Sequence, residues 1–235
     1  MRDPKKTRPI LVTGATGYIG GRLVPKLLEL GYTVRAIGRS LSKLESRPWA
    51  NHPRLEAVQG DVLDVMSLKR AVRGCWASFY LVHSMNAPRR DFAYEDRCAA
   101  WNMVEASEGS SLSRIIYLGW LGDENDPTLS EHLRSRFEVS RILRSGLIPV
   151  TTLRTAMILG SGSASFEILR YLVDRLPVIP TPPWFHTPIQ PICIRNVLNY
   201  LVGCLEHEET VGQIFDIGGP EVLTYERLIK LYAEA

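Results

Sequence analysis

Short apolar runs alternate with apolar stripes of helical period along this chain of 235 residues. The run Ile10–Val12 precedes a stripe from Ile19 to Leu30, and a β-branched run follows at Tyr32–Ile37. Such runs predict strands, and such stripes predict helices that pack one face on a sheet. The alternation continues with predicted strands at 55–61, 77–83, 114–119 and 150–154 and helices at 67–72, 92–108 and 130–145. It favours an α/β fold with a doubly wound, mostly parallel sheet.

Three glycines, Gly14, Gly17 and Gly20, stand where the first predicted strand meets the first predicted helix. The first allows a tight turn, the second lets the backbone approach a pyrophosphate, and the third lets the helix pack closely on the strand. The helix N-terminus then faces the negative charge. The segment therefore predicts a dinucleotide-binding loop, made of Gly14, Ala15, Thr16, Gly17, Tyr18, Ile19 and Gly20. The alternative is a tight strand–helix turn that holds no ligand.

The residues at the end of the second predicted strand indicate which dinucleotide the domain would bind. An acidic residue there would bind the ribose 2′-hydroxyl of NAD, whereas an arginine accommodates the 2′-phosphate of NADP. The chain has Arg39 and Ser40 at this place and no acidic residue between Thr33 and Lys43. A guanidinium and a hydroxyl suit a phosphate. We therefore expect NADP(H) in preference to NAD(H), with a solvated surface arginine as the alternative for Arg39.

Composition narrows the class of protein. The net charge is +3, and the basic residues are spread along the chain, so nucleic-acid binding is not expected. The cysteines Cys75, Cys98, Cys193 and Cys204 lack metal-ligand spacing, so no metal site is predicted. No apolar run approaches the roughly 18 residues of a membrane span. We expect a cytoplasmic protein whose partners are a dinucleotide and a small-molecule substrate, and which is a monomer or homodimer.

The C-terminal third departs from the regular alternation. The proline-rich stretch Leu176–Gln190 is expected to be a loop without regular sheet or helix. A late strand and turn follow at Phe215–Pro220, and Thr224 is expected to cap a last helix. We expect residues 1–160 to form the dinucleotide-binding core. Residues 161–235 would form a C-terminal substrate lobe interleaved with the last strands of one structural domain.

The motif Thr13–Gly20 resembles the cofactor loop of the atypical and extended short-chain dehydrogenase/reductases. The segments 60–62, 153–155, 190–192 and 218–224 resemble them too, and the likeness is nearest to NmrA-like, complex-I-subunit-like and nucleoside-diphosphate-sugar-epimerase-like proteins. The resemblance implies a Rossmann sheet in the order 3-2-1-4-5-6-7. It implies Asp61 and Val62 at the adenine, Val82 and His83 beside the inner ribose, and Leu118, Gly119, Thr155 and Ala156 around the nicotinamide. Some relatives carry a further C-terminal domain, and we expect this chain to be truncated from a longer protein.

One part of the family pattern is missing. Catalytic members carry Tyr-x-x-x-Lys after the fifth strand, where the tyrosine moves the proton. No tyrosine here is followed four residues later by lysine, and the family's serine is replaced in Leu118–Trp120. The expected helix instead carries His132 and Arg136, whose i, i+4 spacing places them on one face.

These residues leave several functions open. In one, His132 is the proton donor, with an ordinary imidazole pKa near 6.5, Arg136 fills the cationic slot at the ribose, and His83 is a second candidate acid. The substrate would be a small carbonyl or an activated double bond. In another, the domain binds NADP(H) as a sensor or scaffold without chemistry, and His132 is an ordinary exposed helix residue. A sugar-nucleotide epimerase is less favoured, because that reaction also needs a basic tyrosine.

The substrate pocket is expected to be built from loops. We expect its walls to come from Leu121–Ser130, Ser161–Phe166 and the proline-rich stretch, with Trp184–His186 as a covering loop. Loop aromatics such as Trp120 and Phe185 could instead pack a lobe onto the sheet. Arg154 is expected to form an internal ion pair.

Overall fold

A seven-stranded parallel sheet forms the centre of the molecule in the computed structural model, which describes residues 4–83, 92–175 and 183–234. The order is β10-β6-β5-β4-β1-β2-β3, which confirms the predicted order, with β10 as the seventh strand. The strands are β1 (Ile10–Thr13), β2 (Val34–Gly38), β3 (Leu55–Gln59), β4 (Ala77–Tyr80), β5 (Arg114–Trp120), β6 (Val150–Thr155) and β10 (Ile214–Ile217). The order reverses between β1 and β4, which is where ligands bind in such sheets.

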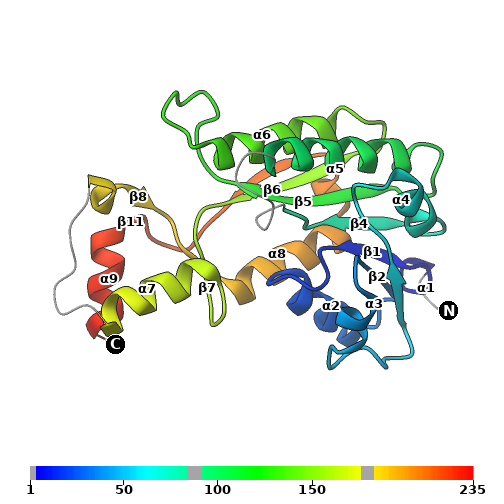
Figure 1. Cartoon of the computed structure of the whole chain (residues 1–235), viewed down its shortest axis with the longest axis horizontal. Coiled ribbons are helices and arrows are strands. Elements are labelled where there is room, and N and C mark those ends of the chain that lie inside the picture. The colour runs from blue at the N-terminus through cyan, green and yellow to red at the C-terminus, as the bar shows by residue number, and fades with distance from the viewer. Residues whose placement is uncertain (1–3, 84–91, 176–182, 235) are drawn as a thin grey trace.

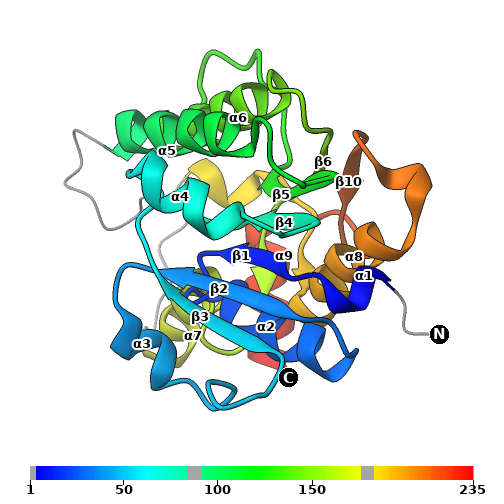
Figure 2. The same cartoon turned by 90° about the vertical axis from the view of Figure 1, so that its right-hand side faces the viewer.

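Helices cover both faces of this sheet (Figure 2). One face packs mainly against α2 (Gly20–Glu29) and α8 (Ile194–Glu206), and the other against α4 (Val65–Val72), α5 (Phe92–Ser107) and α6 (Glu131–Arg144). The remaining short helices near the core are α1 (Pro4–Thr7), α3 (Leu41–Glu45) and the 3-10 turn η2 (Glu208–Thr210). The inner strands β1, β4, β5 and β6 are buried on both faces, as their apolar sequences require, whereas the edge strands β3 and β10 are partly exposed.

Local sequence signals set several helix ends. Gly31 follows α2 with a φ of 84°, a conformation that favours glycine after a helix. The Ser130 hydroxyl accepts the Leu133 N–H at the start of α6. The Thr224 hydroxyl accepts the Arg227 N–H at 3.1 Å, as expected of the residue that caps the last helix.

A small lobe stands beside the carboxyl ends of the strands (Figure 1). It contains α7 (Ala164–Arg175), η1 (Pro183–His186), β8 (Pro188–Ile189), β11 (Leu223–Thr224) and α9 (Tyr225–Glu234), and it has its own buried cluster. A two-stranded pair, β7 (Ile158–Leu159) with β9 (Ile192–Cys193), connects it to the core. The lobe is built from two separate segments, α7 to β8 and β11 to α9. Between them the chain returns to the sheet through α8 and β10.

The expectation that 176–190 contains no regular structure is wrong for its second half. Residues 183–186 form a 3-10 turn, and β8 pairs antiparallel with β11. Proline is compatible with both places, because its fixed φ suits a first helical turn and its missing N–H is tolerated in an edge strand. Residues 176–182 lie outside the described part of the chain.

Close packing of α2 on β1 generates a stability prediction. A Cβ atom at Gly20 would overlap the Gly14 carbonyl oxygen and lie 2.9 Å from the Ala15 Cα, and neither backbone atom can move aside. Gly20→Ala is therefore expected to destabilise the fold by about 1–3 kcal/mol, the usual cost of overpacking.

Gly21→Ala is the matched control, because its nearest contact would be an ordinary 3.6 Å to the Ala15 carbonyl oxygen. Alanine there should stabilise the helix by roughly 0.5–1 kcal/mol. Urea unfolding of both variants measures the difference, and equal midpoints would contradict the packing argument.

Candidate dinucleotide site and active site

The glycine-rich turn after β1 closes tightly against the end of β4. Gly14 has a φ of 70°, and a Cβ atom there would lie 2.5 Å from the Leu81 carbonyl oxygen. The Gly17 N–H donates to the Gly14 carbonyl oxygen at 2.9 Å and completes the turn. Glycine alone suits both this φ and this close approach. The N-terminus of α2 thus stands beside the strand ends, with no acidic residue in its first turn to repel an anion.

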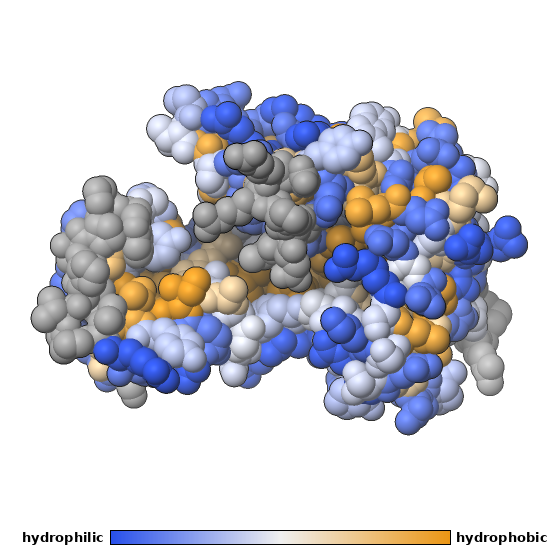
Figure 3. Space-filling view, in the orientation of Figure 1, coloured by the Kyte–Doolittle hydropathy of each residue, from blue (hydrophilic) through white to orange (hydrophobic). Residues whose placement is uncertain are grey.

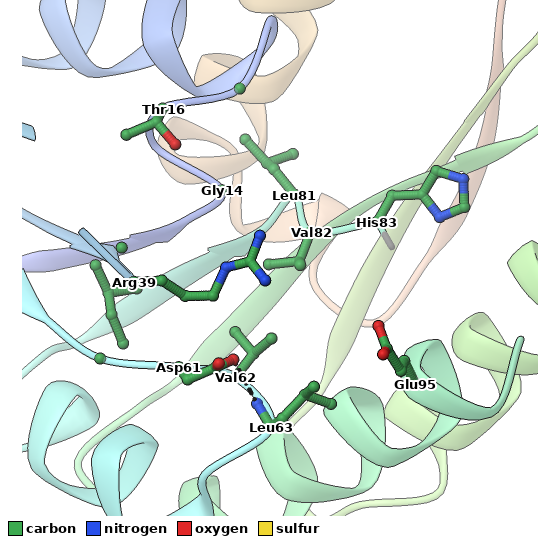
Figure 4. Close-up of a pocket in the computed structure, with 14 residues that line it drawn as sticks. Gly14, Thr16, Arg39, Asp61, Val62, Leu63, Leu81, Val82, His83 and Glu95 are labelled. Carbon is green, nitrogen blue, oxygen red and sulfur yellow. Dashed lines mark hydrogen bonds between the residues drawn. The ribbon is translucent and has the colours of Figure 1, made fainter. Parts of the chain in front are cut away.

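A cavity of about 450 Å³ opens over the carboxyl ends of β1 to β4 (Figure 4). The predicted cofactor residues that line it come from four separate segments, and they are Gly14, Thr16, Gly17, Arg39, Asp61, Val62, Val82 and His83. Further lining residues that we did not predict are Ile37, Gly38, Gly60, Leu63, Leu81 and Glu95. The cavity lies at the point where the strand order reverses, the position at which such sheets bind dinucleotides.

Other predicted loop residues lie outside this cavity. Ala15 is fully buried in the core, and Ile19 lines the neighbouring pocket instead. The Tyr18 ring is covered by the Arg22 guanidinium at 4.0 Å. Ala15 and Tyr18 therefore line neither this cavity nor the neighbouring pocket, whereas Ile19 faces the neighbouring pocket.

Two carboxylates shape the cavity wall. Glu95 extends from α5 towards the cavity, and no sequence pattern separates it from the other acidic residues of that helix (Figure 4). Asp61 accepts the Leu63 N–H at 3.0 Å through Oδ1, so it also fixes the turn after β3.

A basic recess adjoins the cavity at the end of β2. It is lined by Thr16, Gly17, Arg39, Ser40, Lys43, Ser46, Arg47 and Pro48, without a carboxylate among them. Arg39 is exposed, and within the described residues its guanidinium has no hydrogen-bond partner. The Arg47 guanidinium donates to the Thr16 carbonyl oxygen and so holds the recess against the glycine-rich turn.

A second pocket of about 250 Å³ continues from the first and shares Leu81 and His83 with it. It brings together the predicted residues Ile19, His83, Leu118, His132, Arg136 and Thr155. The rest of its lining is Leu81, Gly119, Trp120, Leu133, Ala156 and Ile158, which is mostly apolar. Figure 3 shows apolar surface in the hollow between the lobe and the sheet layer.

The two histidines of this pocket contact each other directly. His83 Nε2 lies 3.0 Å from His132 Nδ1, and the ring centroids are 4.5 Å apart. His83 Nδ1 lies 2.9 Å from Asp96 Oδ2, and the Ser135 hydroxyl donates to the same oxygen at 3.0 Å. The predicted acids His132 and His83 are therefore one hydrogen-bonded unit that ends on a buried carboxylate.

Asp96 is the site residue that the sequence interpretation missed. It lies on the buried face of α5 with Ala93, Ala100 and Met103. A carboxylate in an otherwise apolar helical stripe is a signal of a buried polar contact, and it was available in the sequence.

The pKa of His132 differs from the ordinary value that we expected, although the residue is exposed, as the alternative had it. Desolvation, followed by the charges of His83 and Arg136, lowers the pKa of His132 below 6.5, while Asp96 opposes the shift. His132 is consequently neutral at pH 7, and its protonated form is populated only in more acidic solution.

Arg136 is held at the strand end beneath the pocket. Its guanidinium donates to the Leu118 carbonyl oxygen and lies 5.3 Å from the centre of the Tyr117 ring. The Tyr117 hydroxyl in turn donates to the Arg136 carbonyl oxygen at 3.1 Å. Arg136 thus brings a positive charge to the pocket. Its side chain reaches from α6 to β5 and is held there by these contacts.

The walls of the second pocket differ from those we expected. Neither 121–130 nor 161–166, both described throughout, contributes a lining residue. Phe185 is 4% exposed and belongs to the lobe's core cluster, while the exposed His186 lies near Glu226. The side chain of Trp184 lies outside the described residues. Strand ends, including Trp120, and α6 line the pocket, whereas Phe185 packs within the lobe.

Two further expectations concern ion pairs and metals. Arg154 forms a two-point ion pair with Asp216, at 2.6 and 2.9 Å, which joins β6 to β10 as expected. Among residues 4–83, 92–175 and 183–234, no group of three or more His, Cys, Asp or Glu side chains is placed to hold a metal ion.

Comparison with known proteins identifies the family. Residues 14–165 match the model of the NAD(P)H-binding family, and the chain belongs to that family. The family assignment and the relatives below confirm the resemblance to atypical short-chain dehydrogenase/reductases. Within the described residues, no helix is long and apolar enough to cross a membrane.

Two curated relatives align along most of the chain. A Streptomyces griseus (4-alkanoyl-5-oxo-2,5-dihydrofuran-3-yl)methyl phosphate reductase is 26% identical over 92% of this chain and 69% of its own length. The Arabidopsis thaliana mitochondrial NADH dehydrogenase [ubiquinone] 1 alpha subcomplex subunit 9 is 23% identical over 94% of this chain and 56% of its own.

Other matches are shorter or structural. Several reductases and dehydrogenases match only in part, so that the chain spans 24% to 35% of their length. A nucleoside-diphosphate-sugar epimerase from Staphylococcus aureus has the same fold, with a TM-score of 0.78 and 20% identity over 96% of this chain and 76% of its own.

Proposed function

We propose that the protein is an NADP(H)-dependent reductase that acts on a small, largely apolar carbonyl compound or activated double bond, with His132 as the proton donor. The observation that carries this proposal is the position of His132. It lines an apolar pocket that continues directly from the dinucleotide cavity, and it is hydrogen-bonded to His83, which lines both. A proton donor and an adjoining cofactor cavity are the two elements that carbonyl reduction requires.

The residues present fit the nicotinamide end of the cofactor. Thr155 is 4% exposed, lines the second pocket, and has a buried hydroxyl without a hydrogen-bond partner in the described structure. A buried hydroxyl without a partner is costly, and a carboxamide in the pocket would relieve that cost. Leu118 would support the ring from the neighbouring strand.

The chemistry then divides between cofactor and protein. When bound, the reduced nicotinamide supplies a hydride to the substrate carbon. His132 gives the proton at Nε2 to the substrate oxygen, so that the N–H bond breaks as the O–H bond forms. Arg136 stabilises negative charge that develops at that oxygen through its fixed charge, and the mostly apolar lining of the pocket favours an apolar substrate.

The chemistry predicts how activity depends on pH. Reduction needs His132 protonated, and its pKa lies below 6.5, so kcat/KM should rise as pH falls from 7.5 through that pKa. Oxidation of the corresponding alcohol should show the opposite trend, because it needs neutral His132. Initial rates in both directions between pH 5 and 8 measure this, and parallel profiles would contradict it.

Replacing the proposed donor gives a direct test. His132→Ala should lower kcat by roughly 10²- to 10⁴-fold, the usual contribution of general acid catalysis, and should flatten the pH profile. His207→Ala, at an exposed histidine paired with Glu209, is the matched control and should retain the wild-type profile. Oxidation of NADPH followed by absorbance, with a panel of aldehydes, quinones and enones, supplies the assay. Full turnover by His132→Ala would exclude His132 as the donor.

The basic recess supports the preference for NADP(H). Arg39, Ser40 and Lys43 line the recess beside the glycine-rich turn, and no carboxylate lines it. This basic lining supports a site for the 2′-phosphate of NADP. Arg39→Asp should weaken NADPH binding by roughly 10- to 100-fold, because a hydrogen bond to a charged group is worth roughly 1.5–3 kcal/mol. NADH binding should change much less, because NADH lacks that phosphate.

Calorimetric titration of both cofactors measures this preference. Arg70→Asp, an exposed residue of α4 that lines neither cavity, is the control for added negative charge. Equal losses for NADPH and NADH in Arg39→Asp would make Arg39 a structural residue.

A binding protein without catalysis is the second candidate. Two observations favour it: the chain lacks the Tyr-x-x-x-Lys pair, and one relative that aligns along 94% of the chain is a subunit of the NADH dehydrogenase [ubiquinone] 1 alpha subcomplex. Tight NADPH binding without turnover across the substrate panel would support a sensor or scaffold and would overturn the reductase proposal.

A further inference from the structure

A buried carboxylate stands behind the histidine pair. Asp96 is 4% exposed and Ser135 is 1% exposed, and they lie on the packed helices α5 and α6. Asp96 Oδ2 receives the Ser135 hydroxyl at 3.0 Å and lies 2.9 Å from His83 Nδ1. A buried carboxylate is costly unless it is paired and hydrogen-bonded. The contacts with Ser135 and His83 offset that cost for Asp96.

This arrangement fixes the tautomers of both imidazoles. An ionised carboxylate can only accept hydrogen bonds, so the proton of neutral His83 must lie on Nδ1. His83 Nε2 is then an acceptor, and neutral His132 must donate to it from Nδ1. The Nε2 atom of His132, which has no hydrogen-bond partner among the described residues, is left as the outer end of the chain.

We propose that Asp96, held by Ser135, is a positioning residue that joins His83 and His132 into a two-imidazole proton relay serving the second pocket. This inference rests on the proposed function of His132 and extends it. One proton added to the pair places N–H groups on His83 Nδ1 and His132 Nε2, with one shared proton between the rings. When His132 Nε2 gives its proton to the substrate oxygen, the shared proton settles on His132 Nδ1. The pair is then neutral and takes its next proton from water.

The charges around the pair give Asp96 its energetic role. Arg136 from α6 faces His132 and disfavours its protonation, as does a proton on His83. Asp96 favours protonation from α5, and Glu95 of the same helix lines the dinucleotide cavity beside His83. Asp96 is thus a buried charge in contact with the pair that favours the protonated form and opposes the lowering of the His132 pKa.

The two supporting residues should act in opposite directions. Asp96→Asn removes the charge and should lower the titration midpoint of His132 by roughly one unit or more, as expected for loss of a nearby opposite charge. It should also release His83 from the Nδ1–H tautomer. Ser135→Ala removes a hydrogen-bond donor from the Asp96 carboxylate. More negative charge is then left facing the histidine pair, so the titration midpoint of His132 should rise. The paired variants keep the test informative even if the buried Asp96→Asn does not fold.

Imidazole ¹⁵N chemical shifts of the protein without cofactor report both the tautomer and the midpoint, independently of turnover. Glu138→Gln is the matched control, because Glu138 joins the same two helices through Arg97 at 2.9 Å but lies on the surface. It should leave the tautomers and midpoints of both histidines unchanged.

The outcomes separate the relay from the proposed function. The relay is supported if the titration midpoint of His132 shifts in opposite directions in Asp96→Asn and Ser135→Ala. The pH dependence of kcat/KM for reduction should shift in the same directions. An Nε2–H tautomer of wild-type His83, or variants that titrate like the wild type, would overturn it even if His132→Ala had lost activity. Full turnover in His132→Ala would instead refute the donor role, while the histidine titration would still report whether the hydrogen-bonded pair exists.

Discussion

The site depends on one close approach, that of the first turn of α2 to the end of β1. The approach needs Gly14 at a positive φ and no side chain at Gly20, and it sets the helix N-terminus beside the ends of β1 and β4. Because all seven strands are parallel, their carboxyl ends meet at the same edge. Residues from four segments that are far apart in the sequence therefore line one cavity.

The sequence predicted the features that depend on the backbone, such as strands, helices and the residues that cap them. The strand order is what the family resemblance implied, and the start of a helix at Ser130 and the cap at Thr224 follow from periodicity and capping chemistry. The predicted cofactor residues mostly meet in the two neighbouring pockets, because strand ends are fixed once the sheet is known. Their binding of a dinucleotide stays a prediction.

The parts that were missed depend on which side chains meet across elements. Phe185 and its neighbours have the composition of a pocket wall, yet Phe185 packs in the lobe's own core, among side chains of α7 and α9 that are distant in sequence. Asp96 could be recognised only as an acidic residue in an apolar stripe, and nothing in that stripe says that His83 lies opposite. Periodicity gives the face of a helix, but the partner of that face depends on the tertiary fold.

The interleaved path of the chain has a consequence for folding during synthesis. The lobe's core joins Leu169 of α7 to Leu228 and Ile229 of α9, and between them the chain returns to the sheet to add β10. A nascent chain that has left the ribosome as far as α7 therefore carries a helix whose apolar face has no covering partner yet. The sheet can acquire its inner strands early, whereas the core of the lobe is completed only when α9 emerges. Translation rate and chaperone contact should thus affect the lobe more than the sheet.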